Sequence, residues 1–223
     1  MQAVSVKVGD AYSAKYVNEL YKKLLTFDQN VVYYCLSDNR EGLDKNIEVV
    51  NIKDQFKERK WWSKTSLFEP GLFNEPTIYL DLDCFIHLDL TPFLQQAKEN
   101  KLNLLKTYWF SEGVATKIHQ CTVNTSVMVI NQNNCEPMWK EWKDNKEKIY
   151  KSFYGLDPWL YRRHKNNINF FKPGLAYSFK HGCVFPNDIK QNTLRQLPIC
   201  VFDDVQNRDE VLNGLWRSSE AMG

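Results

Sequence analysis

The sequence has no long hydrophobic run. No window approaches the about 18 uninterrupted apolar residues that a membrane-spanning helix needs. The N-terminus, MQAVSVKVGD, has no basic segment followed by an apolar one, so no secretory signal is predicted. Internal repeats and low-complexity linkers are absent too. We therefore expect no membrane span and one domain over residues 1–223, and leave open that this domain is cut from a longer polypeptide.

Charge of one sign is not in excess either. The 29 Lys and Arg residues nearly balance the 27 Asp and Glu residues, for a formal net charge of +2. This gives no overall attraction to nucleic acid. The six cysteines are scattered singly, with no CxxC pair and no zinc-finger spacing, and a chain of this size needs no disulfide framework. We expect no nucleic-acid partner, reduced thiols and a cytoplasmic location.

The pattern that is present alternates apolar strands with amphipathic helices. At 43% hydrophobic and 14% aromatic residues, the chain is too apolar to be disordered. The alternation predicts the α/β class, with a mixed, mostly parallel central sheet flanked by helices. The expected strands are 4–8, 31–36, 47–52, 77–80, 102–107, 123–131, 174–179 and 199–202, and the expected helices are 13–27, 56–68, one starting near 91, 136–151 and 155–164.

The most informative stretch is PTIYLDLDCFIHLDL, residues 76–90. Asp81 and Asp83 follow an apolar strand, and strand alternation would put both carboxylates on one face, where they repel each other unless a positive charge lies between them. A hard cation, Mn²⁺ or Mg²⁺, takes carboxylate and phosphate oxygens together. Such an ion would neutralise a departing diphosphate.

Two other interpretations of Asp-x-Asp remain open at this point. It could be a charged turn that simply closes a strand. It also occurs in haloacid-dehalogenase-type phosphatases, where the first Asp is a nucleophile and the second a general acid/base. Those enzymes place the motif near the N-terminus, whereas roughly 75 residues with three expected strands precede it here.

Ligands of open α/β sheets bind beyond the carboxyl ends of the strands. The residues expected at those ends are mostly acidic or polar, as a metal and sugar site requires: Gly9, Asp10, Ser37, Asp38, Asp81, Asp83, Asn131 and Asp203.

Several segments, in order, resemble one family. They are VKVGDAYSAKYVNELYKKL, YCLSDNREGL, WWSKTSLFEPGLF, IYLDLDCFIHLDLTPFL, NTSVMVIN, GLDPWLYRR and AYSFKHGC, which together span nearly the whole chain. The sequence is similar to the DxD-motif glycosyltransferases of the GT-A (Rossmann-like) fold, distant relatives of glycogenin. The resemblance extends to viral members that build capsid glycans, for which the location would be the host cytoplasm.

The resemblance implies a nucleotide-sugar donor, namely a UDP-sugar, and a glycan acceptor. It implies nucleotide contacts from Val6, Lys7, Gly9 and Tyr12, with Tyr12 stacking on uracil. It implies that Asp38 accepts a hydrogen bond from the base, and that Asn124 lies near the donor sugar. Asp81 would reach the ribose and the metal, and Asp83 the metal and the diphosphate.

The third metal ligand departs from the family pattern. Relatives carry Phe-His-Gly on a late strand, whereas this chain reads Phe202-Asp203-Asp204. Asp203 is an acceptable hard ligand, and His181 is the other candidate. The family's Gly-Asp-Gln also differs here, since Pro158 follows Asp157. Asp157 would face the donor sugar and acceptor, or cap a helix starting at Pro158, or both.

The implied reaction is metal-dependent glycosyl transfer with retention of anomeric configuration. Lys64 would stabilise the leaving UDP, and Asp157 the oxocarbenium-like sugar. Tyr108, Trp109 and Phe110, in the segment 107–120, could cover the acceptor or simply pack. The alternative from another class is a non-catalytic module that binds nucleotide or glycan, although intact Asp81 and Asp83 disfavour it.

Overall fold

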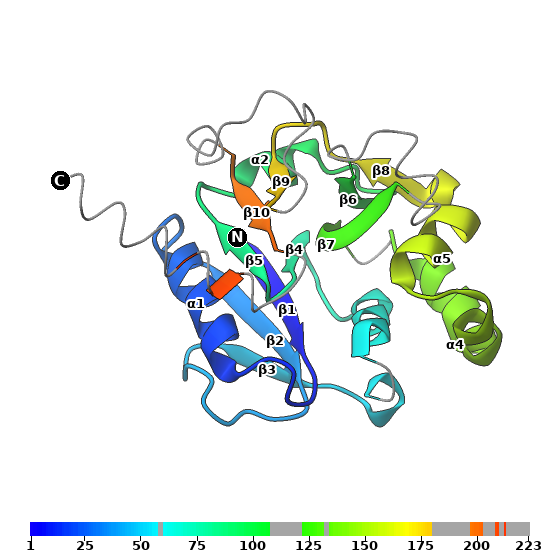
Figure 1. The fold of residues 1–223 in the computed structure, drawn as a ribbon, viewed down its shortest axis with the longest axis horizontal. Coiled ribbons are helices and arrows are strands. Elements are labelled where there is room, and N and C mark those ends of the chain that lie inside the picture. The colour runs from blue at the N-terminus through cyan, green and yellow to red at the C-terminus, as the bar shows by residue number, and fades with distance from the viewer. Residues whose placement is uncertain are drawn as a thin grey trace.

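The centre of the molecule is a sheet of seven strands in the order β3-β2-β1-β4-β7-β6-β8 (Figure 1). The structure is a computed structural model that describes residues 1–57, 60–107, 122–131, 134–179, 197–202, 208–209 and 212. The strands of this sheet are β1 (Gln2–Lys7), β2 (Val32–Ser37), β3 (Glu48–Asn51), β4 (Thr77–Leu80), β6 (Leu102–Lys106), β7 (Val123–Ile130) and β8 (Ile168–Phe170).

Strand direction confirms the predicted mixed, mostly parallel sheet. The strands β3, β2, β1 and β4 are parallel, as are β6 and β8, whereas β7 runs antiparallel to both of its neighbours. The amino end of β7 therefore meets the carboxyl end of β4, where Leu80 pairs with Val127. The expectation that Asn131 joins the acidic edge is wrong, because the preceding residue, Ile130, pairs with Thr77 at the opposite edge.

Helices cover both faces of the sheet (Figure 1). Helix α1 (Ala14–Leu25) buries Val17, Leu20 and Leu24 against one face. On the other face lie α4 (Glu136–Ser152) and α5 (Leu156–Arg163), with Trp142 and Trp159 fully buried. The three- and four-residue spacing of the apolar residues explains why each helix presents a single face to the sheet.

A second, three-stranded sheet was only partly predicted. It has the order β5-β10-β9, formed by β5 (Cys84–Ile86), β10 (Ile199–Val201) and β9 (Ala176–Ser178). The late strands β9 and β10 were expected, whereas β5 and β8 were not. Each missed strand is three residues long, too short to show alternation.

The segment predicted as a helix over 56–68 winds more tightly than expected. It forms two 3-10 helices, η1 (Asp54–Phe56) and η2 (Lys60–Phe68). Within η2, the hydroxyls of Thr65 and Ser66 each donate to the carbonyl three residues earlier, at 2.7 Å. Hydroxyl groups that compete for helix carbonyls in this way favour the three-residue turn.

The helix expected to start near residue 91 is present. Helix α2 (Thr91–Gln96) has Leu90 as its N-cap and Pro92 in its first turn, where the missing N–H costs nothing. Cys35, Cys84 and Cys135 are free thiols, and all three are buried, as is Cys200. Among the helices that the structure describes, none is both long enough and apolar enough to cross a membrane.

Candidate active site

Asp81 and Asp83 lie in a turn between β4 and β5. The N–H of Cys84 donates to the carbonyl of Asp81 at 3.1 Å, which closes that turn. The expectation that strand alternation aligns the two carboxylates is therefore wrong, because β4 ends at Leu80. Both carboxylates nevertheless act on the same cation, the ammonium group of Lys64.

Lys64 forms the central ion pair of this corner. Its Nζ lies 2.6 Å from Oδ2 of Asp81, and the two side chains are only 16% and 18% exposed. Burial works to lower the pKa of Lys64, but the carboxylate of Asp81, followed by those of Asp157 and Asp83, outweighs burial and raises it. Lys64 is therefore a largely buried cation held among three acidic side chains.

The hydroxyl of Tyr79 is the second partner of Asp81. It donates to Oδ1, while Lys64 occupies Oδ2. Burial raises the pKa of Tyr79 well above its ordinary value, and the neighbouring carboxylate of Asp81 adds to this effect. Tyr79 thus stays protonated as a donor, and Asp81 is fixed on both oxygens.

Asp157 reaches the same corner through Thr125. The Thr125 hydroxyl donates to Oδ1 of Asp157 at 2.6 Å and lies 3.5 Å from Nζ of Lys64. Burial raises the pKa of Asp157, whereas Lys64 and the hydrogen bond from Thr125 hold it down. The N-cap of α5 is Gly155, and Asp157 lies within the first turn, so the interpretation of Asp157 as the helix cap is wrong.

Thr125 is held in place by an irregularity in β7. The pairing of β6 with β7 shifts between Leu104, opposite Met128, and Leu105, opposite Asn124. The carbonyl of Ser126 in this bulge accepts the N–H of Asp81 at 2.9 Å. Bulges of this kind redirect side chains beside functional sites. Thr125 could not be predicted from the sequence, since a period-two pattern does not reveal a bulge.

Asn124 has a local structural role in the same bulge. Its Oδ1 accepts the N–H of Ser126 at 3.0 Å. This bond satisfies a backbone donor that regular strand pairing would otherwise use. Asn124 lies one residue from Thr125, whose hydroxyl contacts Asp157.

The residues expected to contact the nucleotide gather at the carboxyl ends of β1 and β2. Lys7 pairs with Ser37 in the sheet, which brings the two strand ends together. The N–H of Gly9 donates to Oδ2 of Asp38 at 3.1 Å, and Gly9 has a φ of 66°, a conformation that glycine adopts without strain. Buried Lys7 points its Nζ toward the carbonyl of Gly9 at 3.4 Å.

Val6 and Tyr12 complete this group. Val6 is half-buried and packs with the apolar cluster beneath α4 and α5. Tyr12, also half-buried, lies with its ring edge-on to that of Tyr16, with 5.8 Å between the ring centroids. The residues proposed for the nucleotide thus lie at the ends of β1 and β2, on one side of β4. Lys64 and Asp157 meet Thr125 of β7, on the other side of β4.

The candidate third metal ligands, Asp203 and His181, lie outside the described residues, as do Tyr108, Trp109 and Phe110. The N–H of Phe202 donates to the carbonyl of Asp83 at 3.3 Å, so β10 ends beside the acidic turn. In the part of the chain that is described, no three His, Cys, Asp or Glu side chains are grouped to hold a metal.

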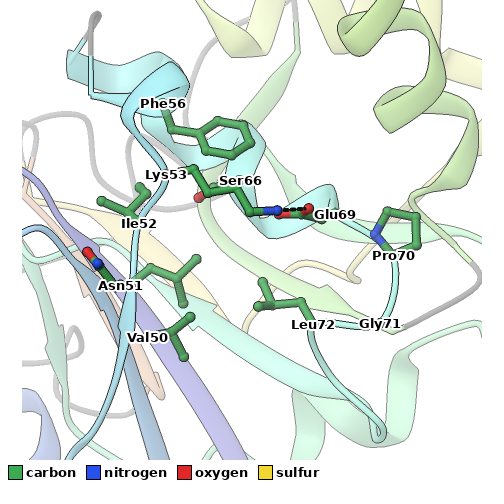
Figure 2. A pocket seen from close by; sticks show the side chains of 11 residues that line it. Val50, Asn51, Ile52, Lys53, Phe56, Ser66, Glu69, Pro70, Gly71 and Leu72 are labelled. Carbon is green, nitrogen blue, oxygen red and sulfur yellow. Dashed lines mark hydrogen bonds and ion pairs between the residues drawn. The ribbon is translucent and has the colours of Figure 1, made fainter.

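A pocket of about 250 Å³ opens farther along the same edge, between the ends of β2 and β3 and the η2 helix. Figure 2 shows Val50 and Leu72 on facing sides of it and the ion pair of Lys53 with Glu69 at its border. Neither Asp81 nor Lys64 lines this pocket. It is a recess next to the site, which the sequence did not predict, and it does not contain the acidic corner.

Known structures share this fold. No family model matches the sequence, and no curated protein matches it significantly. The galactosyltransferase LgtC, crystallised with donor and acceptor sugar analogues, is 14% identical, with a TM-score of 0.61 over 91% of this chain and 87% of LgtC. The glycosyltransferase GlyE of Streptococcus pneumoniae is 20% identical, with a TM-score of 0.62 over 90% of this chain and 55% of GlyE.

A third similar structure is a glycosyltransferase involved in the glycosylation of the major capsid of PBCV-1. It is 15% identical to this chain, with a TM-score of 0.60, and the match covers 95% of this chain and 98% of that one. At such identities the likeness is one of fold. The predicted fold class is confirmed: the chain has the mixed α/β fold of the GT-A glycosyltransferases.

Proposed function

We propose that this protein is a metal-dependent glycosyltransferase that moves a sugar from a UDP-sugar to a glycan acceptor, with retention of configuration. One observation carries the proposal: Asp81, Asp83, Asp157 and Lys64 converge at one corner of a GT-A sheet, beside the strand ends that carry Gly9 and Asp38. Such a corner has the charges needed to hold a sugar diphosphate with its counter-ion.

The residues present fit Mn²⁺ or Mg²⁺. Asp81 and Asp83 offer hard carboxylate oxygens, and Mg²⁺ is often held by one or two carboxylates with substrate phosphates completing its shell. Each carboxylate oxygen has two lone pairs, so the bonds of Asp81 to Lys64 and Tyr79 leave it able to ligate. When bound, the ion would supply Lewis-acid stabilisation of the leaving diphosphate.

The third ligand is proposed to be Asp203. The N–H of Phe202 donates a hydrogen bond to the carbonyl of Asp83, so Phe202 lies beside the acidic turn. Asp203 is the next residue in the chain. Comparing Asp203→Ala with His181→Ala in Mn²⁺ titrations tests this choice, because only the ligand's removal should weaken Mn²⁺ binding.

The protein's own side chains have distinct proposed roles. Lys64 neutralises charge on the departing UDP. Asp157, oriented by Thr125, steadies the positive charge that develops on the sugar ring. The C1–O bond to the diphosphate breaks, the acceptor oxygen bonds to C1 from the same side, and the acceptor's proton passes to the leaving phosphate. Preorganised charges of this kind supply much of enzymatic rate enhancement.

On the nucleotide side, Val6, Lys7, Gly9, Tyr12 and Asp38 are proposed to receive uridine. Gly9 lets the backbone approach the ligand closely, and Asp38 is a hydrogen-bond acceptor at the same point. Asn124 is proposed to lie near the donor sugar. Fold similarity to the PBCV-1 capsid glycosyltransferase supports capsid glycan synthesis as the candidate process.

The test is UDP release from a panel of UDP-sugars with Mn²⁺, with and without glycan acceptors. We expect at least one donor to be hydrolysed or transferred, and an α-linked product from an α-linked donor. If no donor reacts and Asp83→Asn leaves UDP affinity unchanged, the proposal fails. UDP binding without turnover would identify a binding module instead, and Mg²⁺-dependent cleavage of an aryl phosphate would identify a phosphatase.

A further inference from the structure

Two large aromatic side chains stand together on the surface beside the candidate active site. Trp61 is 47% exposed and Tyr154 is 87% exposed. Their ring centroids are 5.8 Å apart, with the planes inclined by 36°. Among the described residues the other large exposed apolar side chains are Phe27 and Leu88. Single exposed apolar residues are ordinary, whereas a paired set of rings calls for an explanation.

The pair is held in a defined arrangement. Nε1 of Trp61 donates to the carbonyl of Tyr154 at 3.1 Å, which satisfies the polar edge of the indole and fixes its orientation. The backbone of Gly155 lies close to the indole, since a Cβ at this position would be 3.6 Å from Cδ1 and Nε1 of Trp61. The two rings therefore form a preformed aromatic surface.

Local geometry places this surface next to Lys64 and Asp157. A 3-10 helix has three residues per turn, so Trp61 and Lys64 lie on the same side of η2, roughly 6 Å apart along its axis. Tyr154 precedes Asp157 by three residues, and η2 packs against α5. Gly9 and Asp38, the nucleotide end of the site, lie on the other side of β4.

We propose that Trp61 and Tyr154 form the subsite that binds a pyranose ring of the glycan acceptor. Aromatic faces suit the C–H face of a sugar ring, and the Tyr hydroxyl supplies a polar group at the rim. The donor would extend from the nucleotide end to Asp157, which leaves the aromatic side for the acceptor. This inference rests on the proposed function for the acceptor's role, but the sugar-binding surface itself can be tested separately.

The test is saturation-transfer NMR of the full chain with methyl β-glucopyranoside, methyl β-galactopyranoside and lactose as probes. Wild type should show transfer from protein to the ring C–H protons of at least one probe. Trp61→Ala and Tyr154→Ala should each weaken binding by about tenfold. Tyr154→Phe keeps the ring and should keep most of the binding. Phe27→Ala, which removes an exposed ring just beyond the C-terminal end of α1, should change nothing.

Tyr154 is the decisive position, because a side chain that is 87% exposed contributes little to folding. Undiminished binding in Tyr154→Ala and Trp61→Ala, or no probe binding in the wild type, would overturn the subsite. If sugars bind through the aromatic pair but no UDP-sugar reacts, the subsite stands and the enzymatic proposal fails.

Discussion

The ammonium group of Lys64 lies 2.6 Å from a carboxylate oxygen of Asp81, with both side chains largely buried. Two acidic residues in one turn require a nearby positive charge, and the protein supplies one from a 3-10 helix that precedes the turn by about a dozen residues. Lys64 thus keeps the acidic corner compatible with folding, and the same charge is available to a bound diphosphate.

Removing one acidic ligand should abolish the proposed chemistry without unfolding the protein. We expect Asp83→Asn to lower sugar transfer by about 100-fold or more, because a neutral amide is a poor ligand for a hard cation. UDP affinity measured by calorimetry should lose its dependence on Mn²⁺. Asp144→Asn, an exposed change on α4, serves as the control and should behave as wild type. Equal Mn²⁺ dependence in the two variants would contradict the assignment.

Thr125 is expected to position Asp157. We expect Thr125→Val to reduce the transfer rate by about 10- to 100-fold, since a hydrogen bond to a charged group is lost at a buried site. The KM for the donor should change little, because the residues proposed to contact the nucleotide, such as Gly9 and Asp38, lie at the ends of β1 and β2. Thr125→Ser retains the hydroxyl and should restore most of the rate. A Ser variant as slow as the Val variant would point to packing rather than positioning.

The pair of His164 with Glu141 should make stability depend on pH. Nε2 of His164 lies 2.7 Å from Oε2 of Glu141, and burial lowers the pKa of His164 below its ordinary 6.5 even though Glu141 opposes this. Just below that pH the unfolded chain binds more protons than the folded one. The free energy of unfolding should therefore fall as the pH falls from above 6.5 through the folded pKa.

His164→Gln replaces the imidazole with a neutral amide, which can still donate a hydrogen bond but does not titrate. We expect its free energy of unfolding to depend less on pH than that of the wild type. The measurement is urea unfolding at about pH 5.5 and at about pH 7.5, on either side of the ordinary histidine pKa. An identical change between the two conditions in both proteins would rule out His164 as the source.

Arg208 should tie the late part of the chain to α1. Its guanidinium lies 2.8 Å from Glu19 and 5.1 Å from the ring centroid of Tyr16, and the side chain is 3% exposed. We expect Arg208→Met to lower the free energy of unfolding by about 1–3 kcal/mol, through lost packing and ion pairing. Thermal and urea unfolding provide the measurement.

The control for this prediction is Lys15→Met. Lys15 also faces Asp209 and Glu19, at 3.6 and 3.8 Å, but its side chain is 58% exposed. Solvent screens such pairs, so the change should stay below about 0.5 kcal/mol. Equal effects at the two positions would show that burial does not distinguish them.

Much of the fold could be predicted because its signals are local. The spacing of Val17, Leu20 and Leu24 predicts α1, and that of Met138, Trp142 and Ile149 predicts α4; all are buried as expected. The two missed strands are three residues long and show no period. The tight winding of η2 was also missed, because it depends on hydroxyl bonds that a period analysis does not detect.

The candidate site, like the fold, was predicted only in part. The Asp81 and Asp83 pair is recognisable in the sequence, because two acids directly after an apolar strand are unusual. Thr125 was missed and Asn131 was misplaced, since both depend on the direction and bulge of β7. Trp61 and Tyr154 are 93 residues apart, and no local pattern relates them.

The sequence by itself determined the α/β class, the faces of the helices and the presence of an acidic turn after the fourth strand. Tertiary structure alone decided that Lys64 reaches Asp81, that Thr125 reaches Asp157 and that two exposed rings meet beside them. Periodicity is encoded within a few residues, whereas these contacts depend on strand direction and register, which the packing of the whole chain selects.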